Sequence, residues 1–326
     1  MRATSLFAVA ALLGAFSSTA AAERSVGSLL LFPEFDNRPG SVQFLTVTNT
    51  SLTAGIVVEI VYIDGDDCSE TNRLIPLTPG DTFTCLTSAH NPEMERGYAY
   101  AFARGKVTGL PIGFDHLAGA SFSLHADGLG EPGPGMGTQS SAEPFVFLSA
   151  VPAGFPTDKN DNGLRELDGR EYMPAPDKVM IPRFFGQSAM VSSRLLLIGL
   201  TGGSQFETTV DFLVFNDNEQ VFSAEYTFQC WDSVALEDIS GAFSNGYLHD
   251  LTENDPDEIL GLPRAESGWI WIDGAVASSS ATTIFDPAVL AVLTERIGTH
   301  SQSMLPFGEG LQPNGALLAR SVDGTE

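Results

Sequence analysis

The sequence predicts an all-β protein built from antiparallel β-sandwiches. Hydrophobic residues make up 43% of the 326 residues and charged residues 17%, a composition that is too apolar for a disordered chain. The chain also contains 33 Gly and 19 Pro, which interrupt it too often for a helical bundle. Between these breaks, apolar and polar side chains alternate in short runs of β-branched and aromatic residues, as they do in half-buried strands.

The strand pattern is clearest in the first part of the chain. We expect strands over residues 42–48, 56–63, 73–77, 82–86 and 97–102. Turn residues separate them, for example Asp64-Gly65-Asp66 and Pro79-Gly80-Asp81. Strands at this spacing are typical of a β-sandwich.

The chain is strongly acidic. Asp and Glu number 41 against 16 Lys and Arg, so the formal net charge is −25. Binding to nucleic acid or to an anionic membrane surface requires clustered cations, and no part of the sequence gathers them. We therefore exclude both as partners.

The first 22 residues have the features of a signal peptide. A short positive start, Met1-Arg2, precedes an apolar run over 6–16, and Ala20-Ala21-Ala22 forms a cleavage site before Glu23. The apolar run is too short to cross a bilayer, and no later stretch approaches the ~20 apolar residues that a transmembrane helix needs. We expect a mature chain without membrane insertion that is secreted to the periplasm, the extracellular space or the cell surface.

Four blocks of the first half recur in the same order in the second half. The pairs are 30–35 with 179–184, 57–64 with 209–216, 82–88 with 227–233, and 95–100 with 266–271. The third pair places Cys85 opposite Cys230. Strands resemble one another, so a single pair would mean little, but four pairs in order predict an internal duplication.

This duplication divides the chain into segments. We expect a signal peptide at 1–22, a β-sandwich domain at 23–125, a Gly/Pro-rich linker at 126–176, a second β-sandwich domain at 177–300 and a C-terminal tail at 301–326. The arrangement resembles tandem immunoglobulin-like sandwiches of exported bacterial proteins, a likeness of fold that implies no activity. An acidic insertion within 236–264 distinguishes the second copy, and we expect it to contact a cationic or ion-bridged partner.

One short C-terminal helix is predicted. Asp286 suits an N-cap, Pro287 suits the first helical position, and Gly298 follows residues 288–297 as a natural stop. Its apolar residues would cover an edge or end of a sheet.

The three cysteines predict one disulfide. Cys68 and Cys85 would close a loop of about 18 residues in an oxidising compartment, which stabilises the fold by about 3 kcal/mol through loop entropy. Cys230 would then remain a buried thiol between Phe228 and Trp231.

A metal site is predicted in the linker. Residues 158–166 fit D-x-N-x-N-G-x-x-E, which resembles the first part of calcium-binding loops of the EF-hand and thrombospondin type 3 kinds. The pattern would make Asp158, Asn160, Asn162 and Glu166 ligands of Ca²⁺. It departs from a full EF-hand at position twelve, which is Gly169, so Asp168 or Glu171 would have to substitute. A hydrated Asn/Asp/Gly turn explains the same residues, and both interpretations stay open.

Aromatic stripes occur in both copies. Tyr98, Tyr100 and Phe102 alternate in one strand, and Trp269 and Trp271 alternate in the other. Either stripe could stack against sugars, but the intervening Ile270 favours a central strand that is buried on both faces.

The sequence contains no G-x-S-x-G, H-E-x-x-H, G-x-x-x-x-G-K or C-x-x-C motif, and its five histidines are scattered. We therefore expect a non-enzymatic protein with a structural or adhesive role at the cell surface or in the extracellular matrix. The alternative is a carbohydrate-binding module protein with a glycan partner, which an exposed tryptophan stripe would favour. A cryptic hydrolase ranks third.

Overall fold

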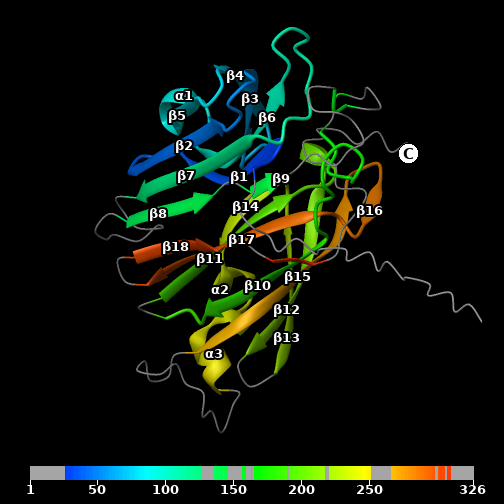
Figure 1. Ribbon diagram of the computed structural model, residues 1–326. Coiled ribbons are helices and arrows are strands. Elements are labelled where there is room, and N and C mark those ends of the chain that lie inside the picture. Colours follow the sequence, from blue (N-terminus) through cyan, green and yellow to red (C-terminus); the bar gives the residue numbers. More distant parts are fainter. Residues whose placement is uncertain are drawn as a thin grey trace, which may run out of the picture.

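Four antiparallel sheets dominate the fold (Figure 1). The computed structural model describes residues 26–125, 136–141, 143–145, 156–158, 163, 165–188, 191–216, 220–250, 266–297, 300–304 and 307–309. The helices in these ranges are short: α1 (Thr87–His90), α2 (Leu236–Ile239), α3 (Asn245–Asp250) and two 3-10 turns, Gly203–Gln205 and Gly241–Phe243. The all-β prediction is therefore confirmed.

The first half of the chain forms two of the sheets. Sheet I has the order β5 (Thr82–Leu86), β2 (Ser41–Asn49), β7 (Leu117–His125) and β8 (Met136–Ser141). Sheet II has the order β4 (Glu70–Leu77), β3 (Ile56–Asp64), β6 (Arg96–Arg104), β1 (Leu29–Asp36) and β9 (Glu143–Phe145).

The second half forms the other two. Sheet III has the order β14 (Trp231–Ala235), β11 (Val191–Gly199), β17 (Val289–Ile297) and β18 (His300–Met304). Sheet IV has the order β13 (Val221–Phe228), β12 (Glu207–Asn216), β15 (Ser267–Ser278), β10 (Lys178–Phe185) and β19 (Phe307–Glu309), and β16 (Thr283–Phe285) pairs with β15.

Three apolar cores hold the sheets in the order I, II, III, IV. One core lies between sheets I and II and includes Phe32, Leu45 and Tyr62. A second lies between sheets III and IV and includes Leu195 and Phe212. The third joins the halves, because side chains of sheet II such as Tyr100 pack against side chains of sheet III such as Leu196. At one side, β8 of sheet I also lies alongside β18 of sheet III (Figure 1).

The two halves have the same strand order. In each, the fourth, third, sixth and first strands and the last short strand form one sheet, and the remaining long strands form the other. A register shift surrounds Pro33 in the pairing of β1 with β6, and another surrounds Pro182 in the pairing of β10 with β15. Gly97 and Gly268 occupy matching places, where an added Cβ would overlap the carbonyl oxygen of Ile63 or of Phe215. The pairings therefore define equivalent positions in the two halves.

The predicted equivalence of Cys85 and Cys230 is wrong. Cys85 lies within β5 opposite Leu45, and the residue that lies opposite Leu195 in β14 is Val234. Cys230 precedes β14 and corresponds to Asp81. The alignment was misled by the T-F-x-C pattern that the two halves share. In the first half the pattern lies within β5, whereas in the second half it spans the end of β13 and the turn before β14.

The predicted C-terminal helix is also wrong. Residues 289–297 form β17, a central strand of sheet III that pairs with β11 on one side and β18 on the other. Consecutive side chains from Val289 to Leu293 are all buried, because the two faces of sheet III pack against different sheets. A continuous apolar run of this kind satisfies helical spacing as well as a doubly buried strand.

Several elements lie in the ranges expected to be a linker and a tail. β8 and β9 lie within 126–176, and Leu167, Tyr172 and Ala175 from the same range are buried in the core between sheets II and III. Most of β18 and all of β19 lie within 301–326. The predicted signal peptide at 1–22 lies outside the described residues.

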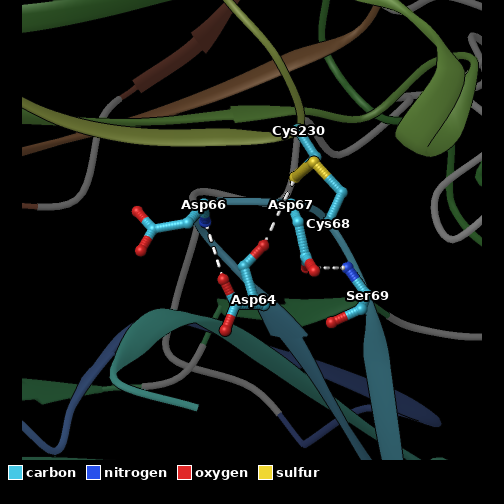
Figure 2. Close-up of a disulfide and its surroundings, with 6 residues drawn as sticks. All are labelled: Asp64, Asp66, Asp67, Cys68, Ser69 and Cys230. Carbon is cyan, nitrogen blue, oxygen red and sulfur yellow. Dashed lines mark hydrogen bonds between the residues drawn. A yellow bond between two sulfur atoms is a disulfide. The ribbon is translucent and has the colours of Figure 1, made fainter.

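A disulfide joins the two halves, and it is not the predicted one. Cys68, in the turn after β3, is bonded to Cys230, with 6.1 Å between their Cα atoms (Figure 2). Cys68 contributes to the core between sheets II and III, whereas Cys85, which has no disulfide, packs against the core on the other side of sheet II. Sheet II thus lies between Cys68 and Cys85, the two cysteines whose closeness in sequence had predicted a bond.

The turn that carries Cys68 is fixed by its aspartates. The amide of Asp66 donates to Oδ1 of Asp64 (2.7 Å), and the amide of Ser69 donates to Oδ1 of Asp67 (2.8 Å), as Figure 2 shows. Cys68 itself has a φ of 58°, in the left-handed region. This geometry directs the sulfur atom of Cys68 toward Cys230 in the second half.

Trp231 packs beside the disulfide in the interface between sheets II and III, which we call the joint. Its indole Nε1 donates to the carbonyl oxygen of Pro33 over 2.8 Å, and the side chain is buried. A Cβ added to Gly65 would overlap the indole, so only glycine fits there. The guanidinium of Arg96 lies over the indole of Trp231, with its Cζ 5.8 Å from the ring centroid.

Removing the disulfide should destabilise the chain. The bond spans 162 residues of sequence, so loop entropy predicts a loss of about 3 to 5 kcal/mol in the free energy of unfolding for Cys68→Ser with Cys230→Ser. Cys85→Ser is the matched control and should change stability by less than about 1 kcal/mol. Urea unfolding measures both, and a linked peptide in a non-reduced digest identifies the pair. A Cys68–Cys85 peptide would contradict the structure.

Glu34, on β1, makes the joint sensitive to pH. Burial, and secondarily the charge of Asp36, raises the pKa of Glu34 from 4.5 to about 7, although Arg194, Arg38 and Arg96 oppose the shift. The folded protein therefore keeps this proton up to about pH 7, whereas the unfolded chain releases it near pH 4.5.

Stability should consequently fall as the pH rises from about 4.5 to 7, by at most about 3.4 kcal/mol and by less because the Glu34 side chain is half-buried and water screens part of the effect. Glu34→Gln should flatten the unfolding free energy over this window when it is measured by urea titration at several pH values. An unchanged pH profile in the variant would assign the effect to another group.

Candidate functional site on the outer face of sheet IV

The outer face of sheet IV presents an aromatic and apolar surface. Three cross-strand pairings place its members side by side: Met180 beside Trp271, Trp271 beside Leu213, and Trp269 beside Phe215. We call these five residues the apolar patch of sheet IV. Leu213 is 44% exposed, and the other four are half-buried.

The same positions in the first half are buried. The equivalents of Met180, Leu213, Phe215, Trp269 and Trp271 are Leu31, Val61, Ile63, Tyr98 and Tyr100. All five belong to the core between sheets II and III. The expectation of a buried stripe is thus correct for Tyr98 and Tyr100 and wrong for Trp269 and Trp271, because only the first stripe has a sheet packed over it.

The aromatic rings of the patch are packed against one another. Phe215 and Trp269 stack with 3.9 Å between centroids and 3° between planes, and Trp271 meets Trp269 at 60°. The stacked pair comes from neighbouring strands, so the stacking direction follows the strand-to-strand direction and the rings stand upright on the sheet. Edges rather than faces of Phe215 and Trp269 therefore point outward.

A charged row borders the patch. Nζ of Lys178 lies 2.8 Å from Oδ2 of Asp273, and this ion pair raises the pKa of Lys178. Asp211 lies beside Asp273 in the sheet. The first-half equivalents of Lys178 and Asp273 are Leu29 and Phe102, so the apolar surface is narrower in the second half.

The outer face of sheet I is a second surface over which no sheet packs among the described residues. Phe44 lies between Leu86 and Phe122 in neighbouring strands, and Phe44 and Phe122 are 38% and 40% exposed. Next to them, the hydroxyl groups of Thr46 and Thr84 hydrogen-bond each other over 3.1 Å. The sequence alternates in β2 as it does in any strand with one buried face and one solvated polar face. It therefore did not indicate that the outer face of β2 carries exposed aromatic residues.

The predicted calcium ligands are only partly described. Asn160 and Asn162 lie outside the described residues. Oδ2 of Asp158 accepts a hydrogen bond from the amide of Gly163 (2.8 Å) and lies 3.9 Å from the guanidinium of Arg165. The amide of Glu166 donates to Glu171 over 3.5 Å. In the described part of the chain, no three His, Cys, Asp or Glu side chains lie close enough to hold a metal ion.

The acidic insertion is described only at its start. Phe243 is buried there against Phe184 and Phe212, so this part completes the core between sheets III and IV. α3 ends at Asp250, and residues 251–265, with most of the predicted acidic cluster, lie outside the described residues. In the ranges that the structure describes, no helix is long and apolar enough to cross a membrane.

One cysteine lies near a histidine, which the sequence did not indicate. The hydroxyl group of Tyr62 lies 2.8 Å from Nδ1 of His90 and 3.8 Å from Sγ of Cys85. Burial raises the pKa of the Cys85 thiol, and burial also lowers the pKa of His90. Both shifts favour the neutral forms of the thiol and the imidazole, whereas an activated cysteine nucleophile requires the thiolate.

The calcium prediction can be tested by thermal unfolding. If the four predicted ligands bind Ca²⁺, millimolar CaCl₂ should raise the melting temperature of the parent and leave Asp158→Ala unchanged, because ligand binding stabilises only the chain that binds. MgCl₂ at equal ionic strength is the control. An equal shift in both proteins would place any calcium elsewhere.

Comparison with known proteins adds no further constraint. No protein-family description matches the chain, and none of the curated proteins compared with it does. One solved structure, titled "Cowpea mosaic virus top component (CPMV-T) - naturally occurring empty particles", matches at 10% identity over 95% of this chain and 100% of that one. Its TM-score of 0.17 is too low to indicate a shared fold, so it carries no argument here.

Proposed function

We propose that the chain is an exported, non-enzymatic β-sandwich protein with a structural or adhesive role at the cell surface or in the extracellular matrix. The observation that carries the proposal is the apolar patch of sheet IV. Apolar side chains lie together there on strands of a six-stranded sheet. A rigid platform of this kind suits attachment through a surface, since little conformational entropy is lost on binding.

The cysteines support export. Cys68 and Cys230 are bonded across the two halves, and such bonds persist in oxidising compartments outside the cytosol. The features of residues 1–22 agree with this proposed location.

We also propose that the two halves arose by duplication of one immunoglobulin-like sandwich. Their identical strand order supports this origin, as do the register shifts at Pro33 and Pro182 and the matching glycines Gly97 and Gly268. Duplication doubles a surface without assembling a catalytic constellation, which fits a binding or structural role.

Carbohydrate binding is the second candidate, because Trp269 and Trp271 lie on the outer face of a sheet. Sugars stack on the faces of aromatic rings. The upright Phe215–Trp269 stack turns ring edges outward, and this favours contact with an apolar protein surface. The patch therefore supports attachment to protein more strongly than to a glycan.

Leu213→Asp should abolish attachment of the purified mature protein to the cells or matrix that carry it, because a carboxylate would be desolvated in the contact. Val107→Asp is the control, since Val107 is 98% exposed in the loop after β6. Circular dichroism checks that both variants fold, and bound fluorescence measures attachment.

Equal attachment by Leu213→Asp and Val107→Asp would refute the role of the patch. Saturable quenching of tryptophan fluorescence by a soluble polysaccharide, absent in Trp271→Ala, would favour the glycan candidate instead. Turnover of a glycoside or ester panel would overturn the non-enzymatic proposal.

A further inference from the structure

We infer that the apolar patch of sheet IV binds the outer face of sheet I in a second copy of the chain, so that copies join head to tail. The inference names a partner for the proposed attachment surface and rests on the proposed function in that respect. Its argument comes from an interface that already exists inside the chain.

The internal interface joins the same two kinds of face. The sheet II face that meets sheet III is equivalent to the outer face of sheet IV, as Tyr98 and Tyr100 correspond to Trp269 and Trp271. The sheet III face that meets sheet II is equivalent to the outer face of sheet I, as Leu196 corresponds to Thr46. In the part of the chain that the structure describes, no further sheet packs over the outer faces of sheets I and IV, so one face of each kind remains.

Sheet IV retains most of the apolar character of this interface. The residues that sheet II contributes are Leu29, Leu31, Val61, Ile63, Tyr98, Tyr100 and Phe102. At these positions sheet IV has Lys178, Met180, Leu213, Phe215, Trp269, Trp271 and Asp273. Only the two end positions have become charged, and Lys178 and Asp273 neutralise each other across strands.

Sheet I offers an uncharged counterpart. The outward-facing side chains of β2, β5 and β7 whose exposure is described are Val42, Phe44, Thr46, Thr48, Thr82, Thr84, Leu86, Ala118, Ala120 and Phe122. None of these is charged, in a chain whose net charge is −25. A solvated sheet face normally carries charges that prevent association, so their absence indicates a contact surface.

The threonines on this face do not oppose docking. Thr46 pairs with Thr84 and Thr48 pairs with Thr82 through their hydroxyl groups, at 3.1 and 3.0 Å. Because each hydroxyl already has a partner, covering the face leaves fewer unsatisfied polar groups. Methyl groups and the rings of Phe44 and Phe122 are then available for contact.

The joint between copies should be weaker than the joint within a copy. Thr46, Thr48 and Thr82 replace Leu196, Ile198 and Trp231, so less apolar area is buried. Asp81 corresponds to Cys230, and no disulfide can form at this position. Association between copies is therefore reversible.

The geometry leads to open chains. Sheets I and IV are the outermost layers, at opposite ends of the molecule (Figure 1). A contact between two different faces is heterologous, and when it does not close on itself it extends from copy to copy.

Sedimentation velocity of the purified mature protein over a concentration series tests the inference. The parent should form oligomers whose size grows with concentration, whereas Leu213→Asp and Phe122→Asp should each remain monomeric. Val107→Asp should behave like the parent. An equimolar mixture of Leu213→Asp and Phe122→Asp should form dimers and nothing larger, because each variant keeps one intact face.

Three results would overturn the inference: a parent that stays monomeric at every concentration, Phe122→Asp that still dimerises alone, or a mixture that stays monomeric. If either Asp variant fails to fold by circular dichroism, Leu213→Gln and Phe122→Gln replace them. Loss of attachment in Leu213→Asp with a monomeric parent would leave the proposed function standing without self-association. If the oligomers follow the expected pattern and Leu213→Asp still attaches normally, self-association would stand and the role of the patch in attachment would be refuted.

Discussion

The packing of sheet II against sheet III is the interaction on which the rest of the structure depends. It buries the second face of sheet II, so that β1 and β6 are apolar on both sides, with Leu30 in one core and Leu31 in the other. It also brings Cys68 to Cys230 and encloses Trp231 against Pro33. As a consequence, sheets I and IV become the outer layers and carry the surfaces that remain for partners.

Local patterns in the sequence predicted the five strands at 42–48, 56–63, 73–77, 82–86 and 97–102, because alternation and turn residues act over a few positions. They did not predict the disulfide. Cys68 and Cys85 are close in sequence, but sheet II lies between them, and only the packing of the two halves selects Cys230. The strand at 289–297 was mistaken for a helix for a similar reason, since burial on both faces removes the alternation that identifies a strand.

The burial of the aromatic stripes could not be predicted from local sequence patterns either. Tyr98 and Tyr100 have the same spacing as Trp269 and Trp271, and the strands pair in the same way. One stripe is buried and the other is half-exposed solely because sheet III covers the first. Along the stripe the strands differ at one end, where Asp273 replaces Phe102, and one charge at the end of a strand does not show which face another sheet covers. The candidate site could therefore not be located from the sequence.

Charge and shape together explain why the uncovered faces matter. Two copies of a chain with a net charge of −25 repel each other, so any contact between them has to come from surfaces that add little charge. The five residues of the apolar patch of sheet IV are uncharged, and at its border Lys178 neutralises Asp273 while Asp211 adds a negative charge. The outward-facing residues of β2, β5 and β7 are uncharged where their exposure is described. An acidic surface elsewhere then limits association to these two faces. Repulsion suppresses indiscriminate contacts, while the complementary sheet faces remain able to meet.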